Sequence, residues 1–325
     1  MSKPQVTEVE QDLTTLDLSD LASLYPNRGH SLSVSHHGEI LQGAVEGADG
    51  RLRYGLVTLR CKIFSSEAVF LPDDTNTVVV APSWRVKAQR AAELALARLD
   101  GNCRGGRLLI RSNIPPCWGL GSSTSDVVAV IQAVANTFGV NISTELTAEL
   151  AVQAEIASDS TMFGDRAVFF GFRDGHVIED FGGRVPPLEV VGFNTDKGAG
   201  VDTLSQPLAC YSTEEIETLR SLVESLRLAV QLQDASLVGK VASASARINQ
   251  RHLPKRHYDC FEKLVERVGA LGLQVAHSGT VVGLLFDPHA SELEQKIEET
   301  RARLAEVGIA SVWRFQTGNN LGNSE

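Results

Sequence analysis

Residues 107–140 place a short apolar strand, a loop of turn-forming residues and an apolar helix next to one another in the chain. The loop, PPCWGLGSSTSD, brings glycines and hydroxyl side chains to the start of the helix. Glycines at 119 and 121 can adopt positive φ, and the first amides of a helix carry partial positive charge. The sequence therefore predicts an anion-binding loop over residues 116–124, which a triphosphate would fit.

The same segment also fits an ordinary helix start, with Ser123 or Ser125 as the N-cap and Asp126 complementing the helix dipole. The loop matches neither GxxxxGK[ST] nor GxGxxG, so a Walker loop and a Rossmann fingerprint are both absent from it. Other segments of the chain are needed to choose between an anion site and a plain helix start.

Strand-like and helical segments alternate in a way that predicts an α+β fold. Four strand-like runs between residues 31 and 80 predict a twisted antiparallel sheet. Apolar spacing predicts helices over 86–99, 126–140, 144–157, 213–249, 258–270 and within 291–309. Further strands are expected in a hairpin turned at Asp174-Gly175, and within 188–195, 272–287 and 311–317.

Length and charge narrow the class of protein. With 325 residues, two domains or one domain of two lobes are expected, and the polar residues 1–28 resemble a loosely docked tail. The formal charge of -10 has the wrong sign for a nucleic-acid binder. No stretch reaches the roughly 20 apolar residues of a membrane span, and the N-terminus lacks signal-peptide features, so we expect a cytoplasmic protein. The five scattered cysteines are expected to be free thiols.

Three separated motifs resemble those of the GHMP kinase family, named for galactokinase, homoserine kinase, mevalonate kinase and phosphomevalonate kinase. The ATP loop of the family, Pro-x-x-x-Gly-Leu-Gly-Ser-Ser, is matched at residues 115–123. The early motif is matched by GEILQG at 38–43 and the late glycine-rich motif by AHSGTVVG at 276–283. The resemblance implies a two-lobed fold, with an N-terminal lobe like the second domain of ribosomal protein S5 (29–187) and a ferredoxin-like C-terminal lobe (188–325).

Within the family, the motifs look most like those of the L-threonine kinase branch, which phosphorylates free threonine on the way to the cobalamin side chain. The segments EIASDSTMF at 155–163 and NQRHLPK at 249–255 carry this likeness. The sequence departs from the pattern at His36-His37, where a small residue and Cys are expected, at the bulky Trp118, and at Thr124. Adjacent histidines on a strand point to opposite faces, so we expect a structural role for this pair.

The resemblance implies an ATP- and Mg²⁺-dependent kinase that phosphorylates the hydroxyl of a small hydroxy amino acid, L-threonine first. Serine, homoserine or another small alcohol, a decarboxylase on the same scaffold, and a non-catalytic nucleotide or metabolite sensor remain alternatives. No nucleic-acid or membrane partner is expected, and a homodimer is left open.

The resemblance also assigns roles to single residues. Asp159 would be the catalytic carboxylate, with Asp165 as its rival and a plain turn residue as the alternative. Ser123 would ligate Mg²⁺. Glu155 could be a second ligand if the carboxylates of Glu155 and Asp159 converge on one helix face. A solvent-exposed glutamate on a helix is the commoner explanation for Glu155. The expected ATP-binding residues are Pro116, Gly119, Leu120, Gly121, Ser122, Ser123 and Thr124.

The acceptor site is expected between the early and late motifs. Glu39 and Gln42, between Gly38 and Gly43, would sit in a tight turn facing a cleft, with Glu39 able to pair with a substrate ammonium. The opposite wall would comprise His277, Ser278, Gly279 and Thr280. A surface turn and a hairpin turn are the plain alternatives for the two segments. Basic residues near 247–256 could attract an anion or could be solvated helix charges.

Overall fold

The computed structural model describes residues 25, 27–99, 105–196 and 208–318. The predicted tail over residues 1–28 therefore lies almost entirely outside the described residues. The described chain divides into two compact units: unit 1 comprises residues up to 35, 64–114 and 122–158, and unit 2 comprises residues 36–63, 115–121 and 159 onward. The predicted lobe boundary at residue 187 falls inside unit 2 and stays a prediction.

Two long strands contribute residues to both units. They are β1 (Gly29–Glu46) and β2 (Leu52–Asp73), joined by a turn in which the Gly47 amide donates to the Arg51 carbonyl over 2.8 Å. The sequence predicts separate strands over 51–64 and 67–72, but β2 runs through the polar Ser65-Ser66 pair. Ser66 is fully buried, and its hydroxyl donates to Asp126 at 2.5 Å, so this polar residue is satisfied within the strand.

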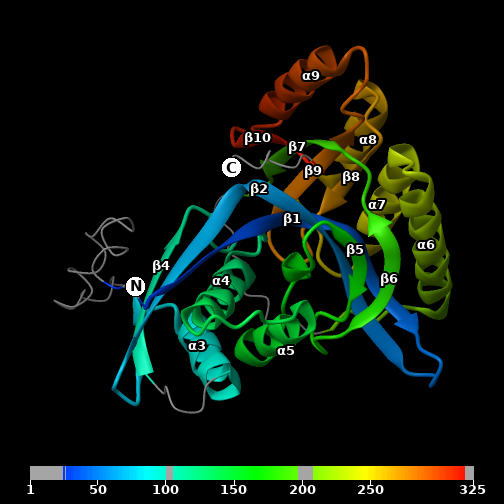
Figure 1. Cartoon of the computed structure of the whole chain (residues 1–325). Coiled ribbons are helices and arrows are strands. Elements are labelled where there is room, and N and C mark those ends of the chain that lie inside the picture. The colour runs from blue at the N-terminus through cyan, green and yellow to red at the C-terminus, as the bar shows by residue number, and fades with distance from the viewer. Residues whose placement is uncertain (1–24, 26, 100–104, 197–207, 319–325) are drawn as a thin grey trace. The chain divides into compact units, whose positions relative to one another are not determined.

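Unit 1 packs two of its three helices against a small sheet, and the third helix packs against those two (Figure 1). The strands β3 (Val78–Ala81) and β4 (Gly105–Ser112) pair in parallel, while β4 pairs antiparallel with β2, from Ser66 opposite Ser112 to Asp73 opposite Gly105. The expected all-antiparallel sheet is thus wrong at β3, because helix α3 (Val86–Leu99) connects β3 to β4, as a parallel pair requires.

The other helices of unit 1 are α4 (Ser122–Thr137) and α5 (Thr144–Glu155). Helix α4 is buried on nearly every side, consistent with its almost continuous apolar sequence. Helix α5 has Ser143 as its N-cap, whose hydroxyl accepts from the Leu146 amide. The helices predicted over 86–99 and 144–157 agree closely, whereas α4 begins four residues before the predicted start at 126.

Unit 2 contains the strand order β10-β7-β9-β8-β1, in which every neighbouring pair is antiparallel, and the hairpin β5-β6, which joins β2 through β5. The bounds are β5 (Arg166–Phe170), β6 (Val177–Arg184), β7 (Glu189–Asn194), β8 (Gly272–Val275), β9 (Val281–Phe286) and β10 (Val312–Gln316). The predicted hairpin at Asp174-Gly175 and the strands near 188–195, 272–287 and 311–317 are confirmed.

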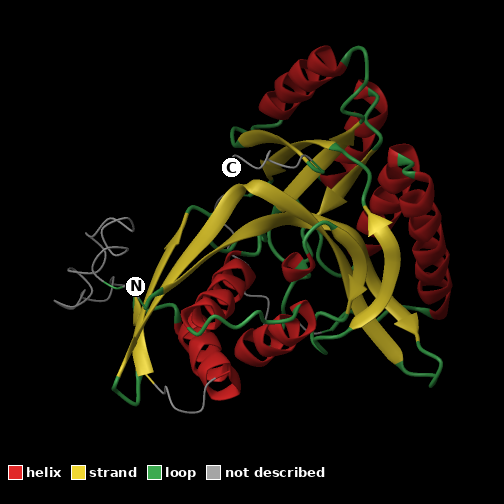
Figure 2. Ribbon diagram, in the orientation of Figure 1, coloured by secondary structure: helices red, strands yellow, loops and turns green. Residues whose placement is uncertain are grey.

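The helices of unit 2 are α6 (Thr213–Leu232), α7 (Ala235–Asn249), α8 (Tyr258–Val268) and α9 (Leu293–Glu306), with a 3₁₀ turn over Thr161–Phe163 (Figure 2). The helical region predicted over 213–249 is confirmed and contains two helices, because Gln233 adopts a left-handed conformation and Asp234 caps α7. Helices α7 and α8 contact β8, and a core around Phe193, Phe261 and Phe286 fills this side. The predicted α+β class is confirmed.

None of the helices in the described ranges combines the length and the apolar character needed to cross a membrane. The four cysteines that the structure describes, Cys61, Cys117, Cys210 and Cys260, are free, as expected. Cys103 lies outside the described residues.

Candidate active site

The early motif lies within strand β1, so the expected tight turn over residues 38–43 is wrong. Gly38 has φ +63, in the left-handed region, and a Cβ there would lie 1.7 Å from the side-chain oxygen of Gln274. This conformation interrupts the regular alternation of side chains along the strand. As a result His36 and Glu39, which are three residues apart, face each other across 3.5 Å from Nδ1 to Oε1.

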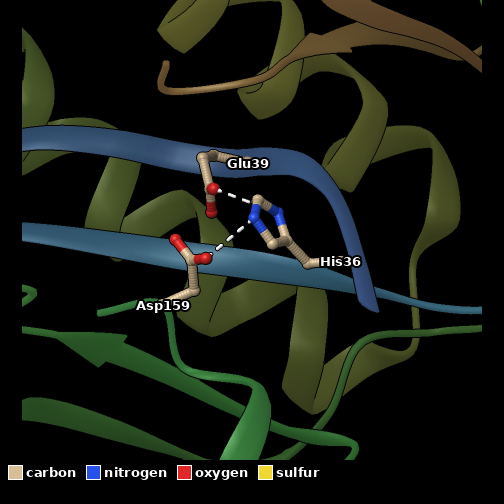
Figure 3. Close-up of side chains that lie close together, drawn as sticks. All are labelled: His36, Glu39 and Asp159. Carbon is tan, nitrogen blue, oxygen red and sulfur yellow. Dashed lines mark ion pairs between the residues drawn. The ribbon is translucent and has the colours of Figure 1, made fainter. Parts of the chain in front are cut away.

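His36 lies between two carboxylates, those of Glu39 and Asp159 (Figure 3). Its Nε2 is 2.8 Å from Oδ2 of Asp159, and its side chain is 4% exposed. Burial alone would lower the pKa of His36, but the charge and hydrogen bond of Asp159, together with the charge of Glu39, outweigh it and raise the pKa to about 9. At neutral pH His36 is therefore an imidazolium that holds Asp159 in place.

The two carboxylates differ in accessibility. Glu39 is 1% exposed, and burial raises its pKa well above the usual value, although His36 opposes the shift. The Asp159 side chain is 18% exposed, so a substrate can reach it. The rival, Asp165, lies within 3.2 Å of Arg60 and 3.9 Å of Lys62, which neutralise its charge.

The part of the predicted ATP loop that belongs to unit 2 contacts this cluster. Gly121 has φ +69, and a Cβ there would lie 2.2 Å from the His36 ring and 2.9 Å from Oδ2 of Asp159. The amide of His36 donates to the Leu120 carbonyl over 3.3 Å, which ties the loop to β1. Only glycine fits at 121, and the end of the loop lies directly beside the predicted catalytic carboxylate.

The loop also contacts the late motif. The amide of Thr280 donates to the Trp118 carbonyl over 3.0 Å, and Gly119 packs against the Ser278 carbonyl so closely that a Cβ would lie 1.8 Å away. Leu120 is buried, whereas Pro116 is exposed. The structure thus brings together the three segments that the sequence singled out.

The hydroxyl side chains at the end of the predicted loop belong to unit 1 and form hydrogen bonds with Glu155. Ser123 donates to Oε2 of Glu155 at 2.6 Å and Thr124 donates to Oε1 at 2.8 Å. Glu155 is 2% exposed, so the expectation of an exposed helix Glu is wrong. The expected common helix face of Glu155 and Asp159 is also wrong, because α5 ends at Glu155.

The plain N-cap alternative for the loop does not hold either. Helix α4 begins at Ser122, so Ser123 and Ser125 lie inside it, and the Ser125 hydroxyl donates to the Val34 carbonyl at 3.1 Å. The Ser123 hydroxyl and the Glu155 carboxylate are hard oxygen ligands held side by side, which suits Mg²⁺. The donor set therefore fits the metal that the resemblance implies.

Gln42 and His277, from the two predicted walls of the acceptor site, meet through a contact of 2.9 Å between Oε1 and Nδ1. Because burial outweighs the attraction of Asp159, the pKa of His277 falls to about 4 and the ring stays neutral. A neutral His277 therefore donates Nδ1–H to the Gln42 oxygen. Gly279 and Thr280 lie further along the same segment, beside the loop.

A cavity of about 310 Å³ within unit 2 opens beside this pair, and His277 and Ser278 line it. Arg173, Asn249 and Arg251 contribute polar groups to its lining. The Nε of Arg173 and the Nδ2 of Asn249 are buried and have no hydrogen-bond partner among the described residues. Glu39 does not line the cavity, so the expected pairing with a substrate ammonium would require it to leave His36.

Sequence reasoning missed His36, Arg173 and Asn249. His36 lies two residues before the early motif, and this position is the signal that could have suggested a role in the site. The expectation of opposite faces for the two histidines is confirmed by their different neighbours: His37 contacts the rings of Trp313 and Phe315. Burial lowers the pKa of His37 to about 3, which fits its expected structural role.

Residues 86–171 match the sequence model of the GHMP kinases N terminal domain. The chain is 28% identical over 211 residues to the L-threonine kinase of Salmonella typhimurium, a match that covers 65% of this chain and 68% of that enzyme. It is 27% identical over 221 residues to the homoserine kinase of Thermococcus gammatolerans, covering 65% of this chain and 70% of that enzyme.

Solved structures share the fold at low identity. The homoserine kinase of Cytophaga hutchinsonii superimposes with a TM-score of 0.65 at 15% identity, over 89% of this chain and 94% of that one. The L. major mevalonate kinase in complex with R-mevalonate gives a TM-score of 0.59 at 17% identity, over 89% and 95% of the two chains. These likenesses confirm the predicted fold.

Proposed function

We propose that the chain is a phosphotransferase of the GHMP kinase type that transfers the γ-phosphoryl group of ATP to the hydroxyl of a free amino acid, L-threonine first. The match of residues 86–171 to the GHMP kinases N terminal domain and the likeness to an L-threonine kinase support this proposal. The observation that carries the proposal is the contact of Asp159 with both His36 and Gly121. A phosphate bound at the end of the loop would lie next to a carboxylate that a buried imidazolium orients.

In the proposed reaction, the oxygen of the acceptor hydroxyl attacks the γ-phosphorus, and Asp159 accepts the proton of that hydroxyl. The bond between the γ-phosphorus and the β,γ-bridging oxygen breaks, and ADP leaves. His36 positions Asp159, since its Nε2 donates to Oδ2 over 2.8 Å. The ATP phosphates would be bound by the residues from Pro116 to Thr124.

Mg²⁺ would be held by Ser123 and Glu155, and when bound it shields the negative charge of the phosphates. The Ser123 hydroxyl and the Glu155 carboxylate already lie 2.6 Å apart in unit 1. Thr124 fixes the second oxygen of Glu155, so the carboxylate has a defined orientation before any ligand arrives.

The acceptor would occupy the 310 Å³ cavity beside His277. Arg173, with its unpartnered Nε, suits the carboxylate of an amino acid, and Asn249 can hydrogen-bond its polar groups. The likeness to an L-threonine kinase places threonine first, and the likeness to a homoserine kinase makes homoserine the second candidate.

A coupled ADP-release assay with L-threonine, L-homoserine and L-serine, combined with mass spectrometry of the product, tests the proposal. We expect ADP formation that requires the acceptor, and a loss of kcat of about 10²-fold or more in Asp159→Asn. Asp165→Asn is the matched control, because Asp165 is neutralised by Arg60 and Lys62, and it should retain most of the activity.

Normal turnover of the Asp159→Asn variant would remove Asp159 from this role. Tight ATP binding without ADP release across the whole acceptor panel would instead identify a non-catalytic nucleotide-binding relative.

A further inference from the structure

A second pocket in unit 2, of about 180 Å³, is lined by Thr195, Asp196, Leu253, Pro254, Lys255, Arg256, Gly279 and Thr280. It differs from the 310 Å³ cavity and shares only Leu253 with it. Two cationic side chains and one carboxylate, that of Asp196, are among its residues. The cation Lys255 is unusual because it is only 6% exposed.

The ammonium of Lys255 is poorly satisfied within the protein. Within the described residues, the ammonium donates a hydrogen bond of 3.3 Å to the Leu253 carbonyl. A buried cation without a counter-charge is costly, and the burial lowers the pKa of Lys255 to about 8. A lysine kept in such a place is suited to an anion that enters the pocket.

The backbone holds Lys255 in position from both sides. Its amide donates to Oε1 of Gln250 at 2.7 Å, and its carbonyl accepts from the Tyr258 amide at 3.2 Å. These two hydrogen bonds fix the backbone of Lys255 within the connection between α7 and α8, which favours a pre-organised site.

A second polar group in the pocket has no partner. Thr280 is 7% exposed, and its hydroxyl oxygen is buried without a hydrogen bond among the described residues. Its carbonyl accepts from both the amide and the hydroxyl of Thr195, at 3.0 and 2.8 Å, which fixes the backbone. An unpartnered hydroxyl donor and a buried ammonium thus line the same small pocket.

The wall of the pocket is also tied to the predicted phosphate loop. The Thr280 amide donates to the Trp118 carbonyl at 3.0 Å, and a Cβ on Gly279 would lie 2.5 Å from the Gly119 nitrogen. The carboxylate of an acceptor already has Arg173 in the other cavity. A phosphoryl group is therefore the anion that best fits this position.

We propose that Lys255 and Thr280 form a binding subsite for a phosphoryl oxyanion, separate from the glycine-rich loop. The proposal rests on the proposed kinase function only for the source of the phosphoryl group, which is either the nucleotide or the phosphorylated product.

Isothermal titration of the full chain with inorganic phosphate, ADP, a non-hydrolysable ATP analogue and O-phospho-L-threonine tests the subsite without turnover. We expect Lys255→Met to weaken binding of at least one of these ligands by 10-fold or more and Lys255→Arg to retain it. Lys263→Met, at an exposed position of α8, is the matched control and should bind like the unmodified chain. Loss only with the nucleotides identifies ATP as the source, and loss only with O-phospho-L-threonine identifies the product.

Unchanged affinity of Lys255→Met for all four ligands, within twofold, would overturn the proposal, and so would an equal loss in Lys263→Met. Thermal unfolding provides a separate readout, because removal of an uncompensated ammonium should not lower the melting temperature. If Lys255→Met does not fold, Thr280→Val keeps the shape of the side chain without its donor, and it should weaken the same ligand about threefold. An unchanged affinity in Thr280→Val would then count against the subsite.

The binding result is independent of the proposed reaction. Phosphoryl binding that depends on Lys255, in a chain that phosphorylates no acceptor, would support the subsite and reject the kinase proposal. Normal turnover of the unmodified chain, together with no effect of Lys255→Met on the affinity for any ligand, would support the kinase proposal and reject the subsite.

Discussion

Replacing His36 with glutamine removes the imidazolium that lies between Glu39 and Asp159. The pKa of His36 rises from 6.5 to about 9, so the protonated form is favoured in the folded protein by roughly 3 kcal/mol, at about 1.4 kcal/mol per pKa unit. The His36 side chain is 4% exposed, so little of this energy is lost to solvent screening.

The pH dependence follows from the direction of this shift. Because the pKa of the folded state lies above that of the unfolded state, the stabilisation is fully present below pH 6.5 and is lost as the pH rises through about 9. We therefore expect the difference in unfolding free energy between the unmodified chain and His36→Gln to shrink by about 3 kcal/mol between pH 6 and pH 9.5. Lys255 also titrates in this range, but its contribution is common to both proteins and cancels in the difference. Glu39 loses the charge of His36 in the variant, so the comparison is made in a Glu39→Gln background, which isolates the contribution of His36.

Urea unfolding at several pH values measures this difference directly. His30→Gln is the matched control, since His30 contacts Glu67 over 2.6 Å but its side chain is 48% exposed, and we expect a much smaller effect. Because the glutamine is uncharged and no longer positions Asp159, kcat should also fall, by about 10²-fold. A stability difference that does not change with pH would refute the assignment of a buried imidazolium at His36.

Two further predictions concern the loop and the residues that follow it. Ser123→Ala and Glu155→Gln should each raise the Mg²⁺ concentration needed for half-maximal activity, which a titration with MgCl₂ at fixed ATP measures. If both variants need the same Mg²⁺ concentration as the unmodified chain, Ser123 and Glu155 are excluded as metal ligands. Gly121→Ala should lower the free energy of unfolding by more than the ~1–2 kcal/mol that a left-handed backbone costs, because its Cβ would clash with the His36 ring. Gly139→Ala is the control: Gly139 has φ +63 and no atom within 4 Å of an added Cβ, so this variant should show the backbone cost alone. Equal losses of melting temperature in the two alanine variants would contradict the packing of His36 against the loop.

Several features of the fold were predictable because they depend on local pattern. Alanine-rich spacing over residues 86–99 matched helix α3 at both ends, and the helix predicted from residue 144 begins there as α5. The glycines at 119 and 121 were expected to take positive φ, and both do so. The parallel pairing of β3, by contrast, depends on where α3 returns the chain, and strand periodicity alone does not contain that information.

The sequence by itself determined the α+β class, the glycine-rich loop and the identity of its flanking hydroxyls, because these follow from side-chain period and backbone freedom within about ten residues. Only the tertiary structure decided which polar and charged side chains meet. Gln42 reaches His277, which is 235 positions away in the chain, and His36 reaches Asp159 after a left-handed glycine turns it toward Glu39. Burial and distance set the charges of these side chains, and both quantities arise from long-range packing.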